Sequence, residues 1–298
     1  MTIKKRRRGF GRKAAAAVCA VLLSAALAVP AGAQSVSISP YRITGRDTDT
    51  YHSVPILADG KSVQAYLIND TSMVAFRAFY ETFLPECKIG YNAQTRTATV
   101  TASRLSVQVT DGSHLLYANG RCLYADTPMT ILDDGRLYVP IRLLAKTLEL
   151  SVEWDGEARR VYLAGEPTPL LSGSEFYDAD ELYWLSRIIS AESRGEPFIG
   201  QVAVGNVVLN RVACPNYPNT VYGVIFDRKY GVQFSPILDG SIWQTPHSAS
   251  VTAAKVCLEG YTVSEDILYF VDPAIAQSHW VENNRPYAFR ILNHAFYY

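Results

Sequence analysis

The chain has 298 residues, of which 48% are apolar and 19% charged, and its 28 Lys and Arg residues balance its 28 Asp and Glu residues. This composition excludes a disordered chain, which would have fewer apolar residues and more charge. The length suffices for two ordinary domains, each with its own core.

The first 33 residues differ from the rest of the chain. A strongly basic start, MTIKKRRRGFGRK, precedes an apolar run of 16 residues and the small-residue pattern Ala31-Gly32-Ala33. This order predicts a secretory signal peptide over residues 1–33, because the run is short for a membrane span. An uncleaved anchor is the alternative. RRRGFGRK loosely resembles the twin-arginine export motif, but an ordinary basic start is favoured.

Removal of residues 1–33 would leave 21 Lys and Arg residues against 28 Asp and Glu residues, a net charge of −7. A nucleic-acid binder would show a basic patch or stripe, so we expect no nucleic-acid partner. No second apolar run is long enough to span a membrane. The sequence therefore predicts an exported, extracellular protein.

Residues 34–163 contain an internal repeat. The segment from Ser72 to Val100 matches the segment from Leu137 to Leu163, and each copy has the pattern of a strand, a helix and a hairpin. In the second copy, Asp155-Gly156 suits a hairpin turn that needs a positive φ angle. The pattern predicts an α+β domain built by duplication.

This half is similar to the copper amine oxidase N-terminal-like domain, a stalk module of exported bacterial proteins. The residues that carry the resemblance are VPIRLLAKTL and VEWDGEARRVYL in the second copy, with a degenerate twin in the first. The resemblance implies a structural or wall-associated module, and it does not imply copper. Ligand binding by this half is the less favoured alternative, because no charged or aromatic cluster marks a site.

Residues 164–176 hold two prolines, two glycines and small polar residues, a composition typical of an exposed linker. A second domain of ordinary size, residues 177–298, follows. The predicted fold class is therefore a two-domain α+β protein.

Four cysteines remain after residue 33: Cys87 and Cys122 in the first half, and Cys214 and Cys257 in the second. One pair in each half of an exported chain allows one disulfide in each, and buried free thiols are an equally favoured alternative. No CxxC, HExxH or paired-histidine spacing indicates a metal site, and no cofactor is expected.

Two glutamates lie in an otherwise core-like stretch, LSRIISAESRGEPFIGQVAVGNVVLNRV. An apolar stripe at helical spacing begins at Leu185 and continues to Glu192. Burial raises the pKa of a carboxyl group, and a carboxylic acid that stays protonated near neutral pH can serve as a general acid. A buried ion pair with Arg194 or Arg211 is the alternative interpretation.

Glu196 precedes a proline, which disfavours helical conformation at the glutamate. We expect it to cap or orient the following helix, predicted from Phe198 to Val212, rather than to take part in chemistry. That helix is apolar nearly all round and should be central in its domain. Its amides, Gln201, Asn206 and Asn210, need buried partners and are expected to brace the glutamates, with ligand contact as the alternative.

The stretch ISAESRGEPFIGQVAVGNVVLNRV resembles the signature of the spore-cortex-lytic, or cell-wall hydrolase, family: A-E-A-R-G-E-P, then G-Q-x-A-V and V-x-N-R-V. YPNTVYGVIFD, QFSPILDGSIW and the closing segments ILYFVDPAIAQSHW and RILNHAFYY match further parts of the family pattern in order. The similarity covers Glu181 to Phe296, although Ser193 stands where alanine is common. The resemblance implies a mainly α, lysozyme-like domain with a small β portion, cleavage of peptidoglycan glycan strands, and Glu192 as the general acid.

The resemblance also suggests which residues support the reaction. A lytic transglycosylase can use Glu192 alone, whereas hydrolysis needs a second carboxylate, for which Glu196 and Asp239 are available. Tyr230 and Trp280 are further aromatic candidates for sugar stacking. The expected substrate contacts are Ser193, Gln233, Phe234, Ser235 and Tyr269. Of these, Gln233 and Ser235 are polar groups in a predicted hairpin.

The expected partner is the glycan strand of peptidoglycan, and the stalk-like half leaves room for a wall-associated protein partner. The protein would act outside the cell, on the wall or on the spore. The alternative is a non-catalytic wall-binding or spore-coat structural protein that retains the fold. The sequence does not distinguish spore cortex from vegetative wall.

Overall fold

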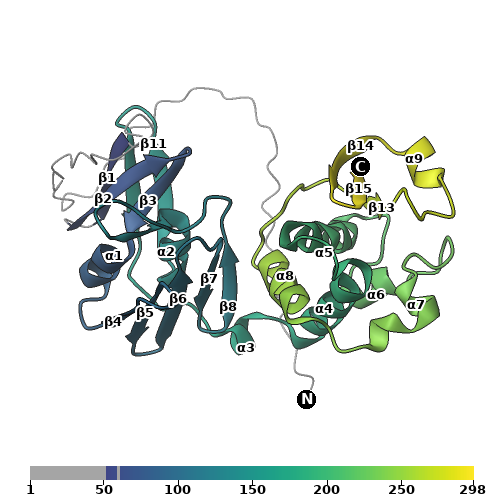
Figure 1. Ribbon diagram of the computed structural model, residues 1–298, viewed down its shortest axis with the longest axis horizontal. Helices are drawn as coiled ribbons and strands as arrows, with labels where there is room; N and C mark the ends of the chain where they lie inside the picture. The colour runs from purple at the N-terminus through teal and green to yellow at the C-terminus, as the bar shows by residue number, and fades with distance from the viewer. Residues whose placement is uncertain (1–51, 59–60) are drawn as a thin grey trace, which may run out of the picture.

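The computed structural model describes residues 52–58 and 61–298 and arranges them as two bodies side by side (Figure 1). The predicted signal peptide, residues 1–33, lies outside the described residues. Among the helices that are described, none is long and apolar enough to cross a membrane. The mixture of sheets and helices confirms the α and β content that the sequence predicts.

The N-terminal half contains two sheets within the described residues. The first comprises β1 (His52–Ala58), β2 (Lys61–Ile68), β3 (Thr71–Ala75), β9 (Thr130–Ile131), β10 (Leu137–Pro140), β11 (Ser151–Asp155) and β12 (Arg160–Ala164), in the order β11-β12-β1-β2-β3-β10-β9. The second comprises β4 (Lys88–Asn92), β5 (Thr97–Ala102), β6 (Leu105–Thr110), β7 (Leu115–Ala118) and β8 (Arg121–Tyr124), in that order. Only β1 and β12 pair in parallel; the other pairings are antiparallel. The helices α1 (Phe76–Phe83) and α2 (Ile141–Thr147) contribute apolar faces to one core with both sheets.

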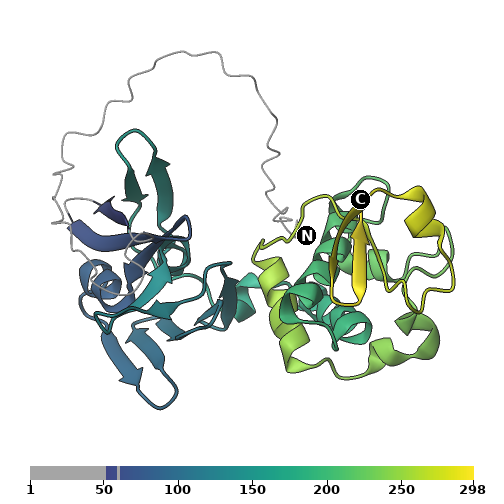
Figure 2. The same ribbon diagram turned by 45° about the horizontal axis from the view of Figure 1, so that its top comes forward.

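The two repeated segments have the predicted order of elements, β3-α1-β4-β5 and β10-α2-β11-β12, and their hairpins extend outward (Figure 2). Each hairpin loop has four residues. The side chain just before the loop, Asn92 in the first copy and Asp155 in the second, accepts hydrogen bonds from two backbone N–H groups of the loop. The positive φ angles belong to Arg96 (52°) and Arg159 (50°), the last residues of the loops. The predicted positive φ at Asp155-Gly156 is wrong, because a four-residue loop has its left-handed residue at the end, unlike a two-residue turn.

Most residues of the segment 164–176 are exposed, as its composition predicts, but the segment is bonded to the N-terminal half at several points. The backbone N–H groups of Thr168 and Leu170 donate to carbonyls at the end of α2, and Leu170 is buried. The segment ends in α3 (Gly173–Phe176), where a Cβ atom on Gly173 would lie 2.8 Å from the carbonyl oxygen of Gly120. The chain is therefore fixed to the sheet up to the start of the second half.

The C-terminal half is mainly helical and carries one small antiparallel sheet in the described residues. Its helices are α4 (Ala179–Ser193), α5 (Phe198–Ala213), α6 (Val221–Ile225), α7 (Pro236–Asp239), the 3₁₀ turn η1 (Ser241–Trp243), α8 (Ser248–Leu258) and α9 (Trp280–Asn284). Its strands are β13 (Tyr269–Val271), β14 (Tyr287–Ile291) and β15 (His294–Tyr297), in the order β13-β15-β14. The predicted central helix from Phe198 is confirmed as α5 and ends one residue later than expected.

Helices α4, α5 and α8 pack most closely at Gly205, in the middle of α5. A Cβ atom at this position would lie 2.7 Å from Cys257 Sγ on α8 and 2.8 Å from Ile189 Cδ1 on α4. A Cβ atom at Gly205 would force the ends of these two buried side chains to shift, so glycine allows the two helices to pack closely here. This contact fixes the end of α4 and the start of α5 relative to each other.

A buried ion cluster joins the two halves. Arg121 on β8 donates to both carboxylate oxygens of Glu259, at 2.7 and 2.6 Å, and Lys146 Nζ lies 2.8 Å from the same carboxylate. The hydroxyl of Tyr177 also donates to Glu259, whose side chain is only 2% exposed. Removing one partner of such a pair leaves an uncompensated buried charge, so this cluster holds β8 against the end of α8.

The disulfide alternative is wrong, because the four described cysteines are free. Cys87 lies just before β4 and Cys122 lies in β8, at opposite edges of a five-stranded sheet and therefore about 19 Å apart. The thiol of Cys257 donates to the carbonyl of Val202 near the start of α5, at 3.3 Å. Cys214 follows the end of that helix, about 18 Å further along its axis, so the second pair is also out of reach.

We predict that Gly205→Ala destabilises the C-terminal half, by about 1–3 kcal/mol, because the added methyl group overpacks the contact between α4 and α8. Thermal unfolding followed by circular dichroism should show a lower Tm. Gly195→Ala is the matched control, because a Cβ atom there would meet nothing within 4 Å. Equal Tm values for the two variants would contradict the close packing at Gly205.

Candidate active site

Glu192 lies in the last turn of α4, where the apolar stripe of the helix ends, and its side chain is half-buried. Its carboxyl group takes part in none of the hydrogen bonds or ion pairs found among the described residues. Burial raises the pKa of Glu192 to about 7, and the negative charge of Asp239 adds to this effect. A large fraction of the carboxyl groups is therefore protonated near neutral pH.

The alternative of a buried ion pair is wrong for both arginines that the sequence suggests. Arg194 is exposed and its guanidinium reaches the side-chain oxygen of Gln244, at 3.5 Å. Arg211 is buried, and its Nε donates to the carbonyl of Leu268 at 2.7 Å. Neither forms an ion pair with Glu192 in the described part of the chain, so the acid keeps its proton by desolvation.

Glu196 is buried, with 8% of its surface exposed, and binds the tip of the last hairpin. The side-chain amide of Asn293 donates to one carboxylate oxygen at 2.8 Å, and the backbone N–H of Asn293 donates to the other at 3.3 Å. The expected capping of α5 is wrong, because Pro197 is the N-cap residue and no side chain caps the helix. Glu196 orients β14 and β15 against the start of α5.

The buried amides of α5 bind backbone groups. Gln201 Nε2 donates to the carbonyl of Glu196 at 3.0 Å, so one amide does brace a glutamate, as predicted. Asn206 and Asn210 instead hold the segment 261–267, because their side-chain amides donate hydrogen bonds to its carbonyls. The side-chain oxygen of Asn206 also accepts a hydrogen bond from the backbone N–H of Val263. None of the three contacts Glu192 through the hydrogen bonds described.

Asp239 ends α7 and is exposed to solvent. Hydrogen bonds from the Ser241 side chain and from the Ser241 backbone N–H, the latter at 2.8 Å, hold the pKa of Asp239 below its usual value. Asp239 is therefore ionised where Glu192 is still partly protonated. Two neighbouring carboxyl groups with divergent pKa values form the kind of pair that supports acid catalysis.

Two of the expected substrate contacts are wrong. Ser193 is 2% exposed, and its hydroxyl donates to the carbonyl of Ile189 at 2.7 Å, one turn back along α4. Phe234 is also 2% exposed and packs in the core of the C-terminal half. Buried side chains with these contacts present no surface to a sugar.

The other expected contacts lie in two places. Gln233 and Ser235 belong to the segment that leads into α7, which is a loop and a short helix and not the predicted hairpin. Ser235 is exposed on the same segment as Asp239. Tyr269 lies on β13, half-buried, and its hydroxyl accepts a hydrogen bond from Tyr217 at 2.9 Å.

Sequence reasoning missed Asn293, which holds Glu196 in place. Asn293 follows Leu292, which has a positive φ of 44°, in the tight turn between β14 and β15. The turn contains no glycine, and 97 residues separate Asn293 from Glu196. No local signal connects the two, so only the fold reveals this contact.

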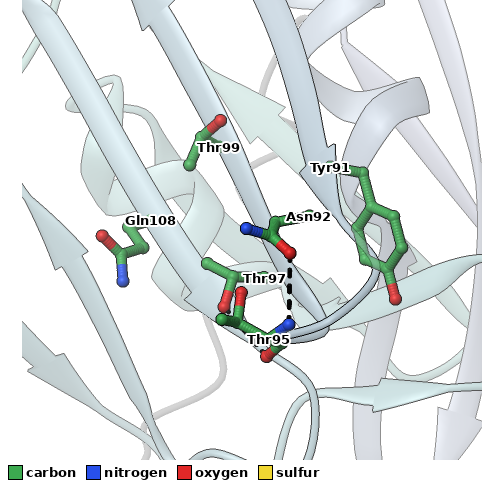
Figure 3. A pocket seen from close by; sticks show the side chains of 6 residues that line it. All are labelled: Tyr91, Asn92, Thr95, Thr97, Thr99 and Gln108. Carbon is green, nitrogen blue, oxygen red and sulfur yellow. Dashed lines mark hydrogen bonds between the residues drawn. The ribbon is translucent and has the colours of Figure 1, made fainter.

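Two hollows of the described surface lie in the N-terminal half, and Glu192 lines neither of them. One has a volume of about 500 Å³ and lies on the face of β4, β5 and β6, where Asn92 accepts the backbone N–H of Thr95 (Figure 3). It is lined by Tyr91, Asn92, Thr95, Thr97, Thr99 and Gln108. A second hollow lies beside β6 and α3. Neither contains an acid–base pair comparable to that of Glu192 and Asp239.

The chain matches two family models. The cell wall hydrolase model matches residues 195–297, which begin three residues after Glu192. The copper amine oxidase N-terminal domain model matches residues 58–163. Together the matches cover most of the two bodies seen in the structure.

The C-terminal half also resembles characterised proteins. It is 37% identical over 120 residues to the spore cortex-lytic enzyme of Bacillus cereus and 36% identical over 120 residues to that of Bacillus subtilis strain 168. These alignments cover 40% of this chain, 45% of the first relative and 38% of the second, so the chain spans less than half the length of either relative.

The catalytic domain of the germination-specific lytic transglycosylase SleB from Bacillus anthracis is 35% identical, with a TM-score of 0.38, over 43% of this chain and 100% of that one. The catalytic domain of the Bacillus cereus SleB protein is 36% identical, with a TM-score of 0.37, over 41% of this chain and 92% of that one. The chain thus joins a copper amine oxidase N-terminal domain to a cell wall hydrolase domain.

Proposed function

We propose that the C-terminal half cleaves the glycan strands of peptidoglycan, as a lytic transglycosylase or a muramidase, with Glu192 as the general acid. The observation that carries this proposal is the half-buried carboxyl group of Glu192, which has no ion-pair partner among the described residues and a pKa of about 7. The names of the similar proteins, spore cortex-lytic enzyme and lytic transglycosylase, support the same chemistry.

In the proposed reaction, Glu192 donates its proton to the oxygen that bridges two sugars, and the bond from that oxygen to the anomeric carbon of the muramic residue breaks. The 6-hydroxyl oxygen of the same muramic residue then bonds to the anomeric carbon and closes a 1,6-anhydro ring. The proton of that hydroxyl returns to Glu192, which regains its starting state. Because the attacking hydroxyl belongs to the substrate and is already close to the anomeric carbon, the reaction avoids the entropic cost of positioning a water.

Asp239 is the better candidate for a second carboxylate. Glu196 is buried and both of its oxygens accept hydrogen bonds from Asn293, which suits a positioning role. Asp239 is exposed, ionised and close enough to Glu192 to raise its pKa. In the proposed transglycosylation it stabilises positive charge at the anomeric carbon, and in hydrolysis it would activate a water instead. Gln233 and Ser235, on the same segment, are proposed to hold the N-acetyl group.

We infer that the N-terminal half, residues 34–163, arose by duplication of a strand–helix–hairpin unit and serves as a structural module of an exported protein. The matching hairpin loops support the duplication. The ion cluster around Glu259 supports a fixed arrangement in which this module carries the hydrolase domain, residues 177–298, on the wall or the spore. The resemblance to spore cortex-lytic enzymes favours the cortex as the substrate.

We predict that Glu192→Gln lowers the rate of glycan cleavage by about 10²–10⁴-fold, because glutamine cannot donate the proton. The purified protein is given wall sacculi, and the muropeptides are analysed by mass. Products with anhydro-muramic ends, which lack one water, identify transglycosylation, whereas ordinary reducing ends identify hydrolysis. The exposed Glu265→Gln is the control and should keep full activity. Full activity of Glu192→Gln would disprove the assignment of the acid.

The pH dependence tests the contribution of Asp239. A general acid acts in its protonated form, so kcat/KM should fall as the pH rises through about 7, the pKa of Glu192. Asp239→Asn removes a negative charge that raises this pKa, so the falling limb should move to lower pH. Asp180→Asn, at the exposed start of α4, removes the same charge and should leave the limb in place. A lower rate at every pH is also expected from the proposed role of Asp239 at the anomeric carbon, whereas an unmoved limb would contradict the effect of its charge on Glu192.

A further inference from the structure

Two arginines of the C-terminal half lie close to Tyr269 without an acidic partner. Arg211, on α5, is 5% exposed, and its Nη1 is buried with no acceptor in the described part of the chain. Arg285, which follows α9, has a buried Nε that likewise lacks an acceptor there. Neither arginine belongs to an ion pair formed by the described residues. Buried guanidinium groups are ordinarily paired with a carboxylate, so this arrangement is unusual.

Aromatic rings take the place of the missing counter-ions. The Arg211 guanidinium carbon lies 5.2 Å from the ring centre of Tyr217 and 5.4 Å from that of Tyr269. The Arg285 guanidinium carbon lies 4.7 Å from the ring centre of Tyr269 and 5.1 Å from that of Trp280. Contacts of this kind offset only part of the cost of burying a charge.

Two acidic residues of this region, Asp227 and Glu282, have other partners. The charge of Asp227 reaches Arg211, but its carboxylate accepts the backbone N–H of Lys229 and forms no ion pair with Arg211. Glu282, on α9, lies 2.6 Å from His279. The protein therefore gathers two positive charges around one ring, and neither charge has an ion-pair partner among the described residues.

This arginine pair reaches solvent and is connected to the candidate active site. Trp280 is 51% exposed, and Arg285 is half-buried, so this end of the cluster is open to a ligand. The other end contacts Phe234, whose ring centre lies 5.4 Å from the Arg211 guanidinium carbon. Phe234 begins the short segment that ends at Asp239, the residue whose charge acts on Glu192.

We propose that Arg211 and Arg285 form a subsite for a carboxylate group of the substrate, with Trp280 as a stacking surface beside it. The proposal rests on the proposed function, since it assumes a peptidoglycan glycan strand. Such a strand has carboxylates on its stem peptides, and on the lactyl group of muramic acid where the peptide has been removed. A guanidinium can bind a carboxylate through two parallel hydrogen bonds, which fixes both position and orientation. Arg211 supplies the buried charge, and Arg285 makes the direct contact.

The test uses the full chain and three glycan preparations from the same sacculi. One keeps its stem peptides, the second is treated with an amidase that leaves free lactyl carboxylates, and the third has those lactyl carboxylates converted to amides. Arg285→Gln should raise KM about tenfold on at least one of the two carboxylate-bearing glycans. It should leave kcat, and KM on the neutral glycan, unchanged. The preparation that shows the effect identifies whether the stem peptide or the lactyl group is bound.

The exposed Arg228→Gln is the matched control, because it removes the same charge from the surface and should not alter KM on any glycan. The same KM for Arg285→Gln and the native chain, or an equal rise on all three glycans, would overturn the proposal.

A binding measurement separates this proposal from the proposed function. Calorimetry compares a peptidoglycan tetrasaccharide with free lactyl groups and chitotetraose, which lacks them, on the Glu192→Gln chain. The subsite predicts tighter binding of the tetrasaccharide with lactyl groups, and loss of that preference when Arg285→Gln is added. Absence of cleavage by the native chain would disprove the proposed function. The calorimetric comparison of the two saccharides would still decide whether the subsite exists. Equal binding of the two saccharides would refute the subsite even in an active enzyme.

Discussion

The candidate active site depends on the contact of three helices at Gly205. Because no side chain separates α5 from Ile189 and Cys257, helices α4 and α8 pack directly on its backbone. The end of α4 and the start of α5 are then fixed only a few residues apart, and these are the positions of Glu192 and Glu196. A larger residue in the centre of α5 would displace both carboxyl groups together, so the packing of the core and the geometry of the site are one constraint.

The two glutamates share a loop but differ in their surroundings. Glu196 accepts two hydrogen bonds from Asn293 and thereby holds the last hairpin. Glu192 has no such donors among the described residues, so burial and the charge of Asp239 favour its protonated form. Hydrogen bonding and desolvation therefore separate a positioning role from an acid role within five residues. Arg211 and Arg285 differ from both glutamates. They place two positive charges around Tyr269, and neither forms an ion pair among the described residues.

Much of this site could be predicted from the sequence, because the relevant signals are local. The apolar stripe leading to Glu192 and the bounds of α5 both follow from residues within a few turns. Contacts between distant segments could not be predicted in this way. The Asn293–Glu196 bond, the burial of Phe234 and the distance between Cys87 and Cys122 depend on how separate elements pack. The segment 164–176 shows the same limit, because its flexible composition does not reveal that its backbone bonds to α2.

The central claim is that Glu192 keeps a proton near neutral pH because of burial beside Asp239. The most direct measurement is the titration of its side-chain carboxyl carbon by NMR in a chain labelled with ¹³C-glutamate, with the signal assigned by its loss in Glu192→Gln. The structure predicts a midpoint near pH 7. A midpoint at the ordinary glutamate value, about 4.3, would contradict the claim and, with it, the role of Glu192 as the acid.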